Sequence, residues 1–146
     1  MANKDASFGL KPVRMMGGSP YSGGQSRYRI AANYGTSIFQ GDIVKQVTGG
    51  TIERAAASSS VPVVGVFNGC MYTDPTSSEQ IFSNYYPAST NASDLIAFIV
   101  DDPETIFEVQ ADDTFPVADL FGNFDIVDTN SGSTYTGISG LELDVT

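Results

Sequence analysis

The chain has 146 residues, of which 41% are hydrophobic and 11% aromatic, so one domain can bury a core without a disulfide or a metal. It holds a single cysteine, Cys70, and no histidine, which excludes an intramolecular disulfide, Ser–His and Cys–His catalytic pairs and histidine metal sites. No segment approaches the roughly 18 apolar residues of a membrane helix, and no apolar run typical of a signal peptide follows the first residues. We therefore expect synthesis in the cytoplasm and no membrane partner.

The charge is divided unevenly along the chain. Residues 1–54 contain three acidic residues and all the basic ones, whereas residues 55–146 contain 14 acidic residues and no Lys or Arg. Phosphate would be repelled by so acidic a body, so we expect no nucleic-acid partner. The basic first part is instead suited to an acidic surface on a partner or on a neighbouring copy. The basic residues are Lys4, Lys11, Arg14, Arg27, Arg29, Lys45 and Arg54.

Residues 1–29 read as an extended N-terminal arm, and residues 30–146 as the body. Glycine and proline interrupt the arm too often for a helix or a long strand, while isolated apolar residues punctuate it. Flexible spacing, apolar anchors and positive charge together indicate a segment that docks on a surface. The alternative is a disordered tail, as is common at chain termini.

From residue 30 onwards the pattern changes to short strands separated by turns. Residues 43–47 alternate in polarity and are followed, across a turn at 48–50, by a second strand at 51–55, which predicts a hairpin. The other predicted strands are 36–39, 61–67, 80–86, 95–100, 105–110 and 141–145.

The predicted fold class is therefore all-β, with a compact barrel or sandwich body. No stretch of 12 residues has a helical period, although 116–121 is suited to one helical turn closed by Gly122. The last strand, 141–145, alternates between apolar and acidic residues, which predicts one apolar face and one acidic face.

Few residues are candidates for chemistry. Cys70 has no neighbouring cation in the sequence to activate it, so we expect a buried thiol. Carboxylates at 101–104 and 112–113 flank the strand 105–110 and offer oxygen ligands for calcium, but their spacing fits no known calcium loop and suits ordinary turns. We expect no metal, no cofactor and no enzymatic activity.

Two features together resemble the decoration, or cement, proteins of tailed-bacteriophage heads. The first is the opening sequence MANKDASFGLKPVR (1–14). The second is the order of GDIVK (41–45), GGTIE (49–53) and VVGVFNGC (63–70): a Gly-Asp strand opener, a short hairpin, a small-residue loop and a strand ending near Gly-Val.

The resemblance implies a non-catalytic structural protein that binds the outside of a phage capsid and stabilises the expanded head. Its partners would be the major capsid protein and other copies of itself, as a homotrimer at local threefold positions on the virion surface. We predict that the contacts come from apolar anchors and basic residues of the arm: Phe8, Leu10, Lys11, Val13, Arg14, Arg27 and Arg29.

Two other functions stay open. One is a receptor- or carbohydrate-binding β-module of a virion appendage, which would use an aromatic cluster at Tyr72, Phe82, Tyr85 and Tyr86. Exposure of Tyr85 and Tyr86 would favour it. The other is a small head or tail completion protein.

Overall fold

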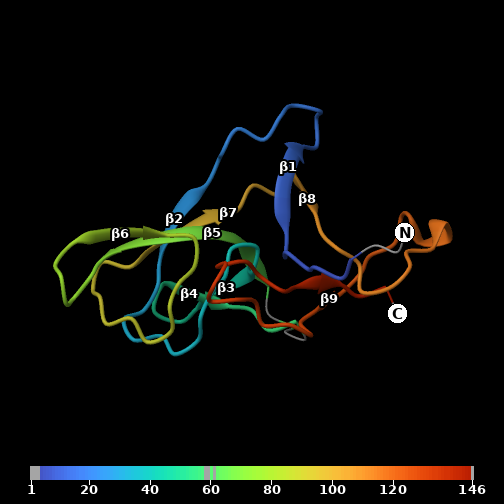
Figure 1. Cartoon of the computed structure of the whole chain (residues 1–146). Helices are drawn as coiled ribbons and strands as arrows, with labels where there is room; N and C mark the ends of the chain where they lie inside the picture. Colours follow the sequence, from blue (N-terminus) through green and yellow to red (C-terminus); the bar gives the residue numbers. More distant parts are fainter. Residues whose placement is uncertain (1–3, 58–59, 61, 146) are drawn as a thin grey trace.

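The structure, a computed structural model that describes residues 4–57, 60 and 62–145, is all-β and is built around a closed barrel of five strands (Figure 1). The predicted fold class is confirmed, and the body is a barrel. The strands are β1 (Lys11–Met15), β2 (Ser26–Arg29), β3 (Ile43–Val47), β4 (Thr51–Arg54), β5 (Val63–Thr73), β6 (Gln80–Ser83), β7 (Ile96–Val100), β8 (Thr105–Glu108), β9 (Ile126–Val127) and β10 (Glu142–Leu143), and one 3-10 turn, η1, spans Val117–Asp119.

The barrel closes in the order β3-β4-β2-β7-β5, with β5 returning to β3. All its pairings are antiparallel except that of β2 with β4, and β6 extends β5 beyond the ring. Closure pairs both edges of the five strands, so the body has few free backbone groups and is rigid.

Most of the predicted strands are confirmed, some with shifted ends. The hairpin of β3 and β4 forms across the predicted turn, and η1 is the predicted helical turn, closed by the Gly122 N–H on the Asp119 carbonyl (2.8 Å). The prediction of a strand at 36–39 is wrong: there Ile38 forms only an isolated bridge with Tyr86. Residue 61, the predicted start of the strand that forms β5, lies outside the described residues.

The last strand differs from its prediction in polarity. Leu141 is buried as expected, but Glu142 is also buried, and its carboxylate accepts a hydrogen bond from the Thr129 hydroxyl (3.0 Å). Strand β10 pairs with β9 on one edge, and on the other the Leu143 N–H donates to the Gln110 carbonyl (2.9 Å). Leu141 and Glu142 are therefore both buried, although one is apolar and the other acidic.

The core fills the barrel and the space under its loops. Apolar side chains from β3, β4, β5 and β7 meet those of the loops, and Cys70 lies among them as the predicted buried thiol. The largest fully buried apolar side chains are Tyr86, Phe67, Ile38, Ile52, Leu95, Ile99, Leu141, Val44 and Val100.

The residues expected to form the arm occupy two settings. Residues 4–25 lie outside the barrel, and within them β1 pairs with β8 in a two-stranded ribbon beside it (Figure 1). Residues 26–29 are β2, an integral strand of the barrel. Residues 1–3 are outside the described part of the chain.

Candidate interaction surface

The beginning of the chain is fixed to the body by a contact between two glycine backbones. Gly9 and Gly41 both have positive φ, at +71° and +100°, and the Leu10 N–H donates to the Gly41 carbonyl (3.0 Å). A Cβ on Gly9 would lie 2.6 Å from the Ser139 Cβ, and one on Gly41 would lie 2.8 Å from the Phe8 carbonyl oxygen. Only glycine allows this approach, so residues 8–10 follow the surface of their own body closely.

The three predicted apolar anchors differ in how exposed they are. Phe8 and Leu10 are half-buried on their own body and line a hollow of about 320 Å³ beside Pro12 and Ile138. Val13, on β1, is 40% exposed. Of the three anchors, Val13 is thus the most available to another molecule.

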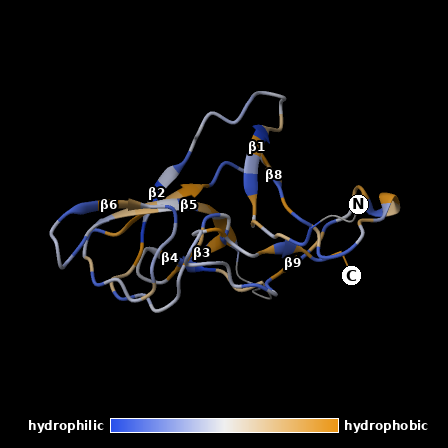
Figure 2. Ribbon diagram, in the orientation of Figure 1, coloured by the Kyte–Doolittle hydropathy of each residue, from blue (hydrophilic) through white to orange (hydrophobic). Residues whose placement is uncertain are grey.

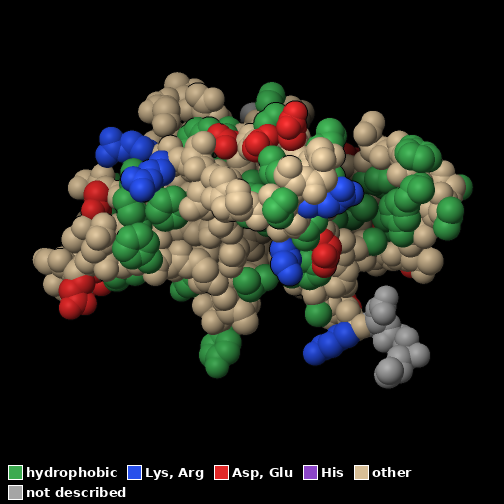
Figure 3. Space-filling view, turned by 90° about the horizontal axis from the view of Figure 1, so that it is seen from above, with side chains coloured by type: hydrophobic (Ala, Val, Ile, Leu, Met, Phe, Trp, Pro, Cys, Tyr) green, Lys and Arg blue, Asp and Glu red, His purple; other side chains and the backbone are tan. Residues whose placement is uncertain are grey.

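The predicted basic residues lie on two strands. Lys11 and Arg14 are on β1 of the ribbon, and Arg27 and Arg29 are on β2 of the barrel; all four are exposed. The Arg27 guanidinium lies 5.9 Å from the centre of the Phe98 ring, and Arg29 Nη2 donates to the Ser93 carbonyl (3.2 Å). Figure 3 shows Lys and Arg in separate groups on this face, with acidic side chains between them.

These four residues, called here the basic surface, form no ion pair with the residues that the structure describes. Within residues 4–57, 60 and 62–145, Arg54 is the one basic side chain with a carboxylate oxygen within 4.0 Å. Lys11 stands opposite Glu108 in the register of the ribbon without closing such a pair. The positive charge of Lys11, Arg14, Arg27 and Arg29 is therefore left for solvent or a partner.

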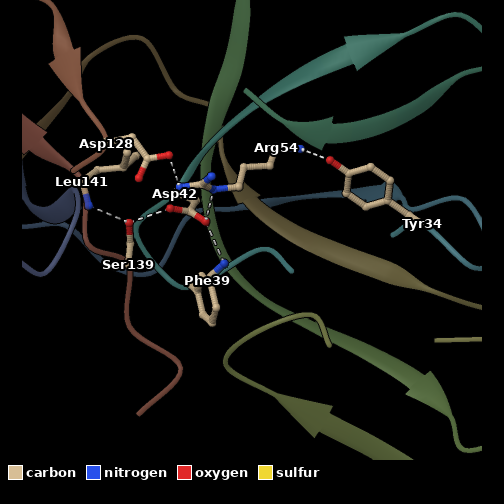
Figure 4. Close-up of polar contacts among 7 residues, drawn as sticks. All are labelled: Tyr34, Phe39, Asp42, Arg54, Asp128, Ser139 and Leu141. Atoms are coloured by element: carbon tan, nitrogen blue, oxygen red, sulfur yellow. Dashed lines mark hydrogen bonds and ion pairs between the residues drawn. The ribbon is translucent and has the colours of Figure 1, made fainter. Parts of the chain in front are cut away.

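Arg54 belongs to a buried polar network that the sequence did not predict (Figure 4). Its Nε donates to Asp42 (2.9 Å), and its Nη2 pairs with Asp128 (2.8 Å). Asp42 is completely buried and also accepts from the Phe39 N–H (2.9 Å) and from the Ser139 hydroxyl (2.5 Å). Burial lowers the pKa of Arg54, but the charges of Asp42 and Asp128 and their hydrogen bonds outweigh this, so its net pKa is raised.

The role of this network is to join distant segments. Asp42 precedes β3 and Arg54 ends β4, while Asp128 and Ser139 come from the last part of the chain. The Leu141 N–H, bonded to the Ser139 hydroxyl (3.1 Å), extends the connection. Asp42, from the Gly41-Asp42 pair that begins the hairpin segment, thus holds the C-terminal segment against the barrel.

Three of the carboxylates considered for calcium accept hydrogen bonds within the chain. Asp101 accepts hydrogen bonds from the Tyr28 hydroxyl (2.7 Å) and the Ser26 hydroxyl (3.0 Å). The hydrogen bond between Tyr28 and Asp101 raises the pKa of Tyr28, and burial of the Tyr28 hydroxyl raises it further. Asp102 and Asp113 accept from nearby N–H groups in turns, at 2.9 and 2.6 Å. In the part of the chain that the structure describes, no three Asp, Glu or Cys side chains gather as a metal site would require.

The aromatic cluster of the ligand-binding alternative does not form one exposed platform. Tyr72 and Tyr86 are buried, and the Tyr86 hydroxyl donates to the Tyr34 carbonyl (2.9 Å). Tyr85 is half-buried and stacks on Phe39 with ring centres 5.8 Å apart. Phe82 alone of the four is largely exposed, so the cluster serves mainly the core.

Sequence reasoning also missed an exposed apolar group between β8 and β9. Val117, Leu120 and Phe121 lie on and beside η1, and each is exposed. The predicted helical turn at 116–121 was the signal that could have indicated this exposure. A single short turn has too few residues to form both an apolar face and a polar face, so its apolar side chains remain exposed unless another element covers them.

Comparison with protein-family models, with characterised proteins and with solved structures gave no match. No helix in the described ranges is long and apolar enough to cross a membrane.

Proposed function

We propose that this chain is a non-catalytic structural protein that binds the outside of a tailed-phage capsid as a decoration, or cement, protein and stabilises the expanded head. Its partners in this proposal are the major capsid protein and other copies of the chain, as a homotrimer on the virion surface. The observation that carries the proposal is the basic surface, whose four cations project from a rigid barrel and its ribbon and form no ion pair with any described residue of the chain.

The physical requirements of such a protein agree with this architecture. A clamp on a particle needs a body that does not deform and a projecting segment that reaches an acidic neighbour. Each exposed ion pair contributes only about 0–1 kcal/mol, so a stable attachment needs several pairs in each copy and many copies on the shell. The four residues on β1 and β2 supply that number.

The contact residues are more restricted than the sequence indicated. Phe8 and Leu10 are half-buried against Gly41 and its surroundings, so the proposed capsid or subunit contacts are Val13, Lys11, Arg14, Arg27 and Arg29. Deletion of residues 1–29 would remove the barrel strand β2 as well as the projecting segment, so point substitutions are the suitable test of these contacts.

The experiment uses expanded, empty heads assembled from the major capsid protein encoded in the same genome. The full chain is compared with a triple variant, Arg14→Ser, Arg27→Ser and Arg29→Ser, and with the control Lys4→Ser, which removes an exposed cation outside the basic surface. We expect the full chain and the control to saturate the heads in threefold stoichiometry, and the triple variant to bind about 10- to 100-fold more weakly. Salt should weaken the full chain more than the triple variant.

Failure of the folded full chain to bind the heads would overturn the capsid proposal. If the triple variant bound as tightly as the full chain, the basic surface would not be the contact. Circular dichroism of each variant shows that a loss of binding is not a loss of fold.

A further inference from the structure

The loop between β8 and β9 presents an apolar knob to solvent, defined here as Val117, Leu120 and Phe121. These side chains are 86%, 63% and 97% exposed. Figure 3 shows hydrophobic side chains gathered at the end of the molecule where this loop lies, and Figure 2 shows the apolar 3-10 turn set away from the barrel. Large apolar side chains exposed together on a soluble surface typically mark a docking site.

The loop that carries the knob is held in shape. At its base the Asp112 N–H donates to the Leu143 carbonyl (3.0 Å), and the Asp144 N–H donates to the Asp125 carbonyl (2.9 Å). The rings of Phe115 and Phe124 meet across the loop with centres 5.3 Å apart. The knob is thus a fixed projection, which lowers the entropic cost of docking it.

The electrostatic setting of the knob selects its partner. Asp119 lies within η1, Asp113 and Asp125 lie in the same loop, and the chain has no Lys or Arg after residue 54. Anionic lipid and nucleic acid are therefore unsuitable partners, whereas an apolar site beside positive charge suits the knob.

The chain itself offers a hollow with apolar walls and a lysine at its edge. The hollow of about 320 Å³ is lined by the apolar side chains of Phe8, Leu10, Pro12 and Ile138, by Gln40, Gly41 and Asn68, and at the ribbon by Lys11 and Glu108. Lys11 has no ion pair within the described residues. No residue of the knob lines the hollow of its own copy.

We propose that the knob of one copy inserts into the hollow of the next, with Asp119 beside Lys11. Every copy then offers one knob and one hollow, so the contact is head-to-tail and closes into a ring when the rotation between copies allows it. The inference rests on the part of the proposed function that concerns other copies of the chain, and it does not require a capsid.

The test measures self-association of the whole chain by sedimentation velocity over a concentration series. The knob variant Val117→Ser with Phe121→Ser changes only exposed side chains, so folding should be kept. The control is Tyr135→Ser, which removes an aromatic side chain that is 96% exposed in another loop. We expect wild type and the control to associate, and the knob variant to associate at least about 30-fold more weakly.

Charge reversal tests the direction of the contact. Lys11→Glu and Asp119→Lys should each weaken association, and the double variant should recover it. A mixture of the knob variant with Lys11→Glu has one intact junction per pair, from the hollow of the first and the knob of the second, and should stop at dimers.

Two results would overturn the inference: wild type that stays monomeric at every concentration, or association that the knob variant leaves unchanged. If such a knob variant also lost head binding, the knob would be assigned to the capsid. The triple arginine variant separates the two proposals, because it should associate normally while losing the heads.

Discussion

Residues of the same type have different environments in the barrel interior and in the parts that project from the barrel. Arg54, whose side chain is only 12% exposed, lies between Asp42 and Asp128, both within 3 Å. Arg14 and Arg27, on the ribbon and the barrel surface, are exposed and unpaired within the described chain. The difference shows that charge inside this molecule joins segments of the chain, whereas charge outside is available for association.

Apolar residues follow the same division. Phe67 on β5 is completely buried, whereas Phe121 beside η1 is almost fully exposed. Substitutions inside should therefore lower stability, and substitutions outside should lower association without lowering stability. Four predictions test this comparison.

The largest expected effect comes from Asp42→Ala. The substitution leaves the Arg54 charge and the Phe39 N–H without their buried acceptor, which costs about 3–5 kcal/mol of the free energy of unfolding. Denaturant unfolding measures it, with Asp113→Ala as an exposed control expected to change stability by less than about 1 kcal/mol. A loss as small as that of the control would mean that the network does not hold the C-terminal segment.

The next effect comes from Gly9→Ala, where positive φ and steric overlap act together. We expect a loss of about 2–3 kcal/mol and faster hydrogen exchange at the Leu10 amide. The matched control is Gly18→Ala, which has a φ of +88° but nothing within 4 Å of the added Cβ, so only about 1 kcal/mol is expected. Equal losses would show that the approach of Gly9 to Gly41 contributes little.

The third prediction concerns Cys70, whose thiol pKa is raised by burial to about 12. The unfolded thiol ionises near its ordinary pKa of about 8.5, so the contribution is complete below that pH and falls as the pH rises towards 12. Between pH 7 and 10 the loss should be about 1–2 kcal/mol. Subtracting the same pH series for Cys70→Ala isolates this group from the tyrosines.

Thiol labelling supplies an independent check. Native Cys70 should not react with a thiol reagent at pH 8 until the protein is unfolded, because the thiolate is the reactive form. Rapid labelling of the native protein would contradict the burial of this residue.

The smallest effect is expected on the outer surface. Arg27→Ala removes the guanidinium from the face of Phe98 and should lower stability by about 0.5 kcal/mol. Thermal unfolding measures this loss. Arg14→Ala, which removes no ring contact, should leave the stability unchanged in the same measurement. A large loss at either residue would mean that the basic surface is structural.

Much of the fold was predictable because it depends on local pattern. The alternation in 43–47, the turn residues Thr48, Gly49 and Gly50, and the apolar run of 95–100 each define their own strand or turn. The strand predicted at 36–39 was wrong because its neighbours are loops, and the isolated bridge of Ile38 forms only when Tyr86 is placed beside it.

The candidate site was predicted in part. Lys11, Arg14, Arg27 and Arg29 are exposed, in agreement with a basic segment available to partners. That Phe8 and Leu10 cover their own body was not predictable, because it depends on the approach of Gly9 to Gly41, 32 positions along the chain.

The sequence by itself determined the all-β class, the hairpin of 43–55, the buried thiol and the separation of basic from acidic parts, since these follow from composition and from periods of a few residues. Only the tertiary structure decided that the strands close into a barrel and that Asp42, Arg54 and Ser139 meet. It also decided that Phe121 stays outside the core. The physical reason is that closure and burial depend on pairings between distant segments, and no local pattern specifies which distant partner a residue will meet.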